Sequence, residues 1–240
     1  MRLTVSVLSL LAVAGTTSVA QGAPQTAVYQ SSWADVAAVA GTSVVALLPT
    51  FLKLPGGAPS CAPCNPSGLP GLDRWVVGKN SPLARNGSTV LLLGVGGVAT
   101  YLAAHDRSAP HARGNVAVIA NSISWAGATT DWLKVAFHRK RPVLYTSGAA
   151  TAAASPNSRR SFPSSHTALA FAAATSYAVL AGREHLPYRT RDALLLYGGA
   201  AGVGALRMVG GSHFPSDVLG GAVLGTGIGW LVAVVHPKAP

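Results

Sequence analysis

Two histidines and an aspartate in the second half of the chain have the residue types needed to cleave a phosphate ester. His166 ends the segment Ser161-Phe-Pro-Ser-Ser-His166, and His213 stands four residues before Asp217. A carboxylate on one imidazole nitrogen fixes the tautomer of the ring and leaves its other nitrogen free to attack. A second histidine could protonate the leaving oxygen. The alternative for His213 and Asp217 is an ordinary loop whose aspartate complements a helix dipole.

Three cations accompany these histidines. Lys134 and Arg141 are seven residues apart, close to two helical turns, so both could lie along one face of a helix. Pro142 disfavours helical geometry at Arg141, which places Arg141 at the helix exit, directed into the next loop. Arg207 adds a third positive charge. An ammonium and a forked guanidinium together bind phosphate well, although a basic helix end or the positive flank of a membrane span would contain the same residues.

Ser164 and Ser165 stand at the start of an apolar segment. Pro163 can open a helix there, and either serine can cap it. The free N–H groups at such a helix start, together with the serine hydroxyls, form a cradle for an anion. His166 stands at the edge of this cradle. The alternative is a plain helix cap with an incidental histidine.

The elements that must position these residues are apolar segments separated by polar breaks. No period-two alternation of Val, Ile and Tyr is visible, so strands are not expected. Ala, Leu and Gly dominate, as in closely packed helices with small contact residues. We predict an all-α protein with six helices, over Val36–Leu54, Ser88–Ala104, Val116–Val135, Thr167–Ala181, Ala193–Val209 and Val218–Val235. Several of them are short compared with the roughly 20 residues that a bilayer requires, so they could be untilted membrane spans or the buried helices of a soluble bundle.

Two long loops interrupt this pattern. Residues 55–87 are rich in Pro, Gly and Ser and contain both cysteines, Cys61 and Cys64, for which we expect a disulfide in an exported protein. A redox site would need a thioredoxin-like context, and a metal site would need further ligands nearby. Residues 136–165 form the second loop, and a loop of this length is usually functional. Its alanine-rich piece at 149–154 is expected to be mobile.

The N-terminus has the features of a secretory signal. Arg2 is followed by an apolar run from Leu3 to Ala14, and Ser18-Val-Ala20 supplies the small residues that a signal peptidase reads. The alternative is an uncleaved anchor helix. We therefore divide the chain into a signal peptide at 1–20, a first helix with the cysteine-containing loop at 21–87, and a core at 88–235.

Composition indicates a membrane protein or a helical bundle with little polar surface. Charged residues make up 10% of the 240 residues, against roughly 25% in ordinary soluble proteins, and mean hydropathy is +0.37. The formal net charge is +11, but aromatic residues are only 7% and do not interleave with the basic ones. Nucleic acid is therefore not expected as a partner, whereas a phosphate-bearing substrate or an anionic lipid surface fits the charge.

Taken together, the three polar stretches resemble the type 2 phosphatidic acid phosphatase superfamily, which includes bacterial acid phosphatases and vanadium haloperoxidases. Its signature is K-x6-RP, PSGH and SR-x5-H-x3-D. The matching residues here are Lys134…Arg141-Pro142, Pro163-Ser164-Ser165-His166 and Leu206-Arg207…His213…Asp217. The resemblance covers about residues 88–235. Ser165 replaces the family's Gly and narrows the pocket, and Leu206 replaces a Ser and removes a hydroxyl.

The resemblance implies a role for each matching residue and a six-helix core. His213 would be the nucleophile that forms a phosphohistidine, Asp217 would orient it, and His166 would act as general acid and then as base. The phosphoryl oxygens would be bound by Lys134, Arg141, Ser164, Ser165 and Arg207. No metal or other cofactor would be needed, because the cations already neutralise the developing charge.

The leading hypothesis is a metal-independent phosphatase that acts on a lipid phosphate or diphosphate in the cell envelope. The alternatives are a soluble secreted acid phosphatase acting on small esters, a vanadium haloperoxidase, which is usually much longer, and an inactive membrane binding protein, which the intact His213, His166 and Asp217 disfavour. No protein partner can be inferred.

The expected topology contains a conflict. A cleaved signal leaves the new N-terminus outside the membrane, and six spans would then place both long loops in the cytoplasm. Export instead favours an outward-facing site and oxidised cysteines. Three resolutions stay open: one segment does not span, the N-terminal segment is not a signal, or the bundle is soluble. We favour a membrane-associated protein with an outward-facing site, and we expect His213 near the surface.

Overall fold

The computed structural model describes residues 28–237. All regular secondary structure in this part of the chain is helical. The predicted signal peptide at 1–20 lies outside the described residues, so the signal and the export inferred from it stay predictions.

Six long α-helices form the body of the protein. They are α1 (Trp33–Phe51), α3 (Pro82–Ala104), α4 (Ala109–Phe137), α6 (Ser165–Arg183), α7 (Arg189–Val209) and α8 (Pro215–Val235). Each corresponds to one predicted segment, and each begins before it. In α3, for example, Pro82 occupies the first turn and the Ser81 hydroxyl accepts a hydrogen bond from the Ala84 N–H. Such polar first turns are invisible to a search for apolar runs.

We predicted six helices, whereas the described residues contain eight α-helices. The prediction omitted two short ones. The additional helices, α2 (Gly71–Arg74) and α5 (Ala149–Ala153), lie in the two long connections, as do the 3-10 turns η1 (Pro66–Gly68), η2 (Pro142–Tyr145) and η3 (Pro156–Arg159). Most of the alanine-rich piece at 149–154, for which we expected mobility, forms the helix α5. Alanine has a high helix propensity, and the fully buried Ala149 packs against Leu144 and Cys64.

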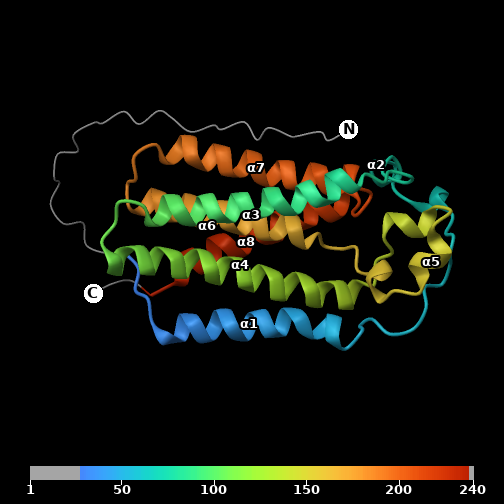
Figure 1. Cartoon of the computed structure of the whole chain (residues 1–240), viewed down its shortest axis with the longest axis horizontal. Coiled ribbons are helices and arrows are strands. Elements are labelled where there is room, and N and C mark those ends of the chain that lie inside the picture. The colour runs from blue at the N-terminus through green and yellow to red at the C-terminus, as the bar shows by residue number, and fades with distance from the viewer. Residues whose placement is uncertain (1–27, 238–240) are drawn as a thin grey trace, which may run out of the picture.

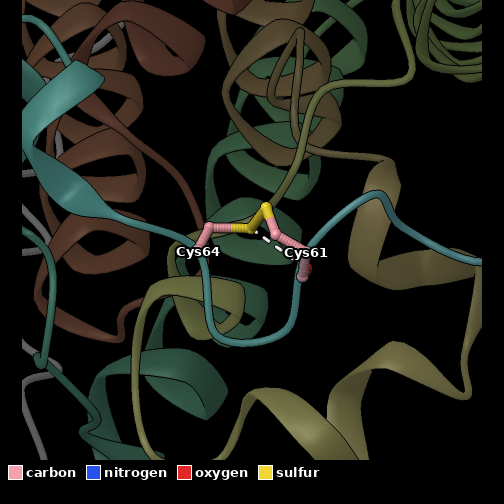
Figure 2. Close-up of a disulfide and its surroundings, with 2 residues drawn as sticks. All are labelled: Cys61 and Cys64. Carbon is pink, nitrogen blue, oxygen red and sulfur yellow. Dashed lines mark hydrogen bonds between the residues drawn. A yellow bond between two sulfur atoms is a disulfide. The ribbon is translucent and has the colours of Figure 1, made fainter.

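The two long connections are joined to each other. Cys61 and Cys64 form a disulfide in the α1–α3 connection (Figure 2). The Cys64 N–H donates a hydrogen bond of 2.8 Å to the Leu144 carbonyl in the connection between α4 and α6. Figure 1 shows α2 and α5, one from each connection, at the same end of the bundle. The short α7–α8 turn also lies at this end, so all three polar stretches converge there.

The centre of the bundle is α6, whose alanines pack closely against neighbouring helices. Ala170, Ala173 and Ala174 are fully buried. A side chain at Gly225 or Gly229 would collide with backbone atoms of α6, and one at Gly221 would collide with the carbonyl of its N-cap, Ser164. This stripe of glycines, spaced by four, lets α8 approach α6 closely. The close approach brings the N-terminal ends of α6 and α8, which carry His166 and Asp217, next to each other.

Four helices are long and apolar enough to cross a membrane: α1, α3, α7 and α8. Their outward faces carry large apolar side chains in solvent-exposed positions. Trp33, Leu47 and Phe51 are exposed on α1, and Leu83 and Val90 are exposed on α3. Many large apolar side chains exposed on such helices suggest membrane association.

Candidate active site

His213 is held in one orientation by the loop that precedes α6. Its Nδ1 lies 2.7 Å from the Ser161 carbonyl oxygen. Because a carbonyl can only accept, Nδ1 carries the proton, and Nε2 of the neutral ring is left with a free lone pair. His213 is 1% exposed, so the expectation of a near-surface position was wrong. The α1–α3 connection covers this turn, and Gly211, with φ of 66°, lies directly against the Lys79 carbonyl.

Asp217 stands behind His213 and contacts it through Ser161. The Asp217 Oδ2 atom is 3.6 Å from His213 Nδ1, too far for a hydrogen bond. The same oxygen accepts hydrogen bonds from the Ser161 hydroxyl at 2.6 Å and from the Phe214 N–H at 2.8 Å. Ser161 thus binds the carboxylate with its hydroxyl and the imidazole with its carbonyl. Sequence reasoning did not assign this role to Ser161.

His166 lies in the first turn of α6, and its Nε2 is 3.1 Å from the Thr89 hydroxyl on α3. Burial and the nearby charges of Arg207, Lys134 and Arg141 lower the pKa of His166 to about 4. Burial and Arg141 likewise lower the pKa of His213 to about 3. Both imidazoles are therefore neutral near pH 7 when the site holds no anion. Arg141 and Arg207 thus lower the pKa of both rings.

Arg141 lies in the connection after α4. The helix ends at Phe137, and His138 adopts a left-handed conformation with φ of 48°. Arg141 therefore lies in the loop beyond the helix exit, as Pro142 predicted, and does not share a helical face with Lys134. The Arg141 guanidinium is oriented by the Asn157 carbonyl at 2.9 Å, the Asn157 side chain at 3.0 Å and the Ser212 carbonyl at 3.2 Å. The loop after α4 thus directs Arg141 toward the turn that carries His213.

Lys134 already has polar partners. Its Nζ lies 3.1 Å from Asp131 Oδ1 and also makes a short hydrogen bond to the Ser165 hydroxyl. The Ser165 hydroxyl in turn donates to Thr130 at 3.0 Å. Asp131 also pairs with Arg160 at 3.2 Å. The side chain that replaces the family's glycine is therefore directed at the lysine, and the same lysine is paired with Asp131, which sequence reasoning missed.

Ser164 and Arg207 have hydrogen-bonding capacity to spare. Ser164 is fully buried, and its hydroxyl accepts a hydrogen bond of 3.0 Å from Thr167, which leaves its own proton free to donate. The Arg207 Nη1 atom donates to Ser88 at 3.3 Å, but its buried Nε has no hydrogen-bond partner. A buried N–H without a partner is costly. Leu206 instead faces Gly87 on α3.

Two further charged residues contact the site, and the sequence analysis singled out neither. Arg139 makes a short hydrogen bond to Asp217 Oδ1, and its other terminal nitrogen lies 2.6 Å from Asp73 Oδ2. Arg139 falls inside the K-x6-RP stretch, so its position was a signal that could have been used. Asp73 comes from α2, in a loop with no recognisable motif.

The fold and the site together define an α-helical protein of the phosphatase type. The model of the PAP2 superfamily, the type 2 phosphatidic acid phosphatases, matches residues 115–240, which contain all three polar stretches. The chain belongs to the PAP2 superfamily, as the resemblance predicted. No curated protein and no solved structure matches the chain. Family membership supports a hydrolase that acts on phosphate esters.

Proposed function

We propose that this protein is a metal-independent phosphatase that cleaves a lipid-linked phosphomonoester or diphosphate through a phosphohistidine at His213. The main observation that supports this proposal is the 2.7 Å hydrogen bond from His213 Nδ1 to the Ser161 carbonyl, which leaves Nε2 unprotonated and available for attack. The positive charges of Arg141 and Arg207 act on the same ring. A neutral imidazole beside fixed cations is suited to attack a phosphorus atom whose oxygens those cations hold.

Substrate binding uses groups that surround this ring. The phosphoryl oxygens are bound by Lys134, Arg141, Arg207 and the Ser164 hydroxyl, together with the backbone N–H groups of Ser165 and His166 at the start of α6. The unpartnered Nε of Arg207 supports this assignment. A bound phosphate dianion offsets the cations that lower the pKa of His166. Binding therefore raises that pKa and favours the protonated imidazole.

The first chemical step transfers the phosphoryl group to the enzyme. The Nε2 atom of His213 forms a bond to phosphorus while the bond between phosphorus and the leaving oxygen breaks. His166 donates its proton to that oxygen, so the leaving alcohol or phosphate carries no additional negative charge. The phosphorylated imidazole keeps its Nδ1 proton, and the Ser161 carbonyl and the Asp217 carboxylate stabilise the positive charge that develops on the ring.

The second step returns the enzyme to its starting state. His166 is now neutral and takes a proton from a water molecule as the water oxygen attacks phosphorus. The bond between phosphorus and Nε2 breaks, and inorganic phosphate leaves. No proton or electron is left over, and the cations that neutralise charge in the first transition state serve the second as well.

Activity is expected to survive chelators and to be blocked by vanadate. Vanadate can adopt the trigonal geometry of the phosphoryl transition state, and analogues of that state bind far more tightly than substrates. The measurement is phosphate release before and after treatment with EDTA, followed by a vanadate titration. Loss of activity in EDTA with recovery on adding a divalent cation would contradict the metal-free mechanism. Bromide oxidation by the vanadate-treated protein would favour the haloperoxidase alternative.

The lipid part of the proposal is supported by the exposed apolar faces of α1 and α3 and by the four helices that could span a membrane. These surfaces support a position of the catalytic end of the bundle at a lipid interface. Binding of an acyl or prenyl chain can then contribute energy that orients the phosphoryl group at His213.

We therefore expect kcat/KM to be about tenfold or more higher for phosphatidate or a polyprenyl diphosphate than for glycerol phosphate. The assay uses mixed micelles, with lipid and soluble substrates compared at equal bulk and surface concentrations. A short-chain phosphatidate serves as the matched control, because it has the same head group with less apolar chain. If glycerol phosphate equals or exceeds the lipids, the protein is instead a phosphatase of small esters.

A further inference from the structure

A chain of charges, with a half-buried arginine between two buried carboxylates, runs from the α1–α3 connection to the carboxylate behind His213. Asp73 and Asp217 are both completely buried, and Arg139 lies between them. One terminal nitrogen of the guanidinium is 2.6 Å from Asp73 Oδ2, and the other makes a short hydrogen bond to Asp217 Oδ1. Buried charges are costly to desolvate unless each has a well-placed partner. Arg139 is the partner that both carboxylates share.

Asp73 holds the arginine and the start of α8 together. Its Oδ1 accepts hydrogen bonds from the Ser216 N–H at 3.0 Å and from the Ser216 hydroxyl at 2.8 Å. Its Oδ2 accepts from Arg139. Ser216 lies in the first turn of α8, immediately before Asp217. Asp73 therefore fixes both the guanidinium and the turn of helix that carries Asp217.

Aromatic rings fix the plane of the guanidinium. The centre of the Arg139 guanidinium is 5.0 Å from the ring centroid of Phe214 and 6.0 Å from that of Phe162. Phe214 follows His213 in the chain, and Phe162 follows Ser161. The arginine is thus held by contacts to the neighbours of both residues that share the 2.7 Å hydrogen bond. Its forked shape lets one nitrogen reach each carboxylate, which a lysine could not reproduce.

We propose that Asp73 and Arg139 are positioning residues of the catalytic site. Asp73 directs Arg139, and Arg139 binds Asp217 Oδ1, so that Asp217 Oδ2 stays turned toward Ser161 and His213. This inference rests on the proposed function, because it assigns the two residues to orientation of the His213 nucleophile. It also makes the α1–α3 connection, which the disulfide and the Cys64 hydrogen bond to Leu144 secure, a contributor to the site.

The test compares Asp73→Asn, Arg139→Gln and the double variant in the full-length protein. Each single change is expected to lower kcat about 10- to 100-fold, the range seen when groups that orient metal ligands are removed. KM should stay within about threefold, because neither residue contacts the phosphate in the proposed site. If Asp73 acts through Arg139, the kcat of the double variant should be no lower than that of Arg139→Gln alone. Two results would overturn the proposal that Asp73 acts through Arg139. One is a change in KM without a change in kcat, and the other is a double variant whose fold-loss of kcat equals the product of the two single fold-losses.

A matched control separates positioning from stability. Glu184 is a buried carboxylate at the C-terminal end of α6, paired with His111 at 2.7 Å and Asn115 at 3.2 Å. Glu184→Gln is expected to lower Tm and leave kcat unchanged. If Arg139→Gln does not fold, Arg139→Lys is measured in its place. Arg139→Lys keeps the positive charge but lacks the guanidinium that reaches two carboxylates, so the same loss of kcat is expected.

A readout that does not require activity distinguishes the inference from the proposed function. In protein labelled with ¹⁵N-histidine, the His213 ring signal is assigned by its loss in His213→Gln. The wild type should show a protected Nδ1 proton, and Asp73→Asn and Arg139→Gln should lose that protection. A wild type that releases phosphate from no ester would refute the proposed function, and the histidine signal would still decide the positioning. Unchanged kcat and an unchanged signal in both single variants would refute the inference.

Discussion

Replacement of His213 by glutamine is expected to reduce phosphate release by about 10⁴-fold or more, a loss comparable to removal of the nucleophile in other covalent hydrolases. Glutamine approximates the imidazole in size but cannot form the covalent intermediate. The variant should also fail to incorporate labelled phosphate in a rapid-quench experiment, whereas the wild type should give an acid-labile and alkali-stable phosphoenzyme.

The control for this prediction is His105→Gln. His105 is exposed at the C-terminal end of α3, at the opposite end of the bundle from the site. Its replacement should leave turnover unchanged. Because His213 is buried, the Tm of both variants must be compared with that of the wild type, so that misfolding is not mistaken for loss of the nucleophile. Labelling of folded His213→Gln at the wild-type level would show that another residue is phosphorylated.

Replacement of His166 by asparagine is expected to lower kcat by about 10²- to 10⁴-fold for substrates with alkoxide leaving groups, the usual contribution of a general acid. The first step should be largely spared for 4-nitrophenyl phosphate, whose leaving group needs no proton. Phosphoenzyme should then accumulate, because no base activates water in the second step. A burst of nitrophenol followed by slow turnover is the measurement. Equal loss of the first step for both kinds of substrate would contradict the assignment.

The pH dependence of kcat/KM provides a second test of His166. A general acid must be protonated, and the protonated fraction of His166 in the free protein increases as the pH falls toward its pKa of about 4. The wild type should therefore gain kcat/KM as the pH is lowered from neutrality, until His213 begins to be protonated at its pKa of about 3. His166→Asn should lose the part of this gain that ionisation of the substrate does not explain.

Much of the chemistry was readable from the sequence because it depends on local spacing. The separation of His213 from Asp217 and of Ser164 from His166 sets which residues share a turn or a helix start, whatever the rest of the fold does. The long apolar runs likewise predicted the six long helices, because burial or a bilayer requires them. The family match confirmed the class of protein that these motifs indicated.

Only the tertiary structure decided how these stretches meet. His213 is buried, and the α1–α3 connection packs against the glycine turn that precedes it. Asp73 meets Arg139 across 66 positions of the chain and Ser216 across 143. No local pattern encodes such contacts. They arise when helices that share a buried core bring their connections to one end of the bundle, where an unpaired buried charge must find a partner.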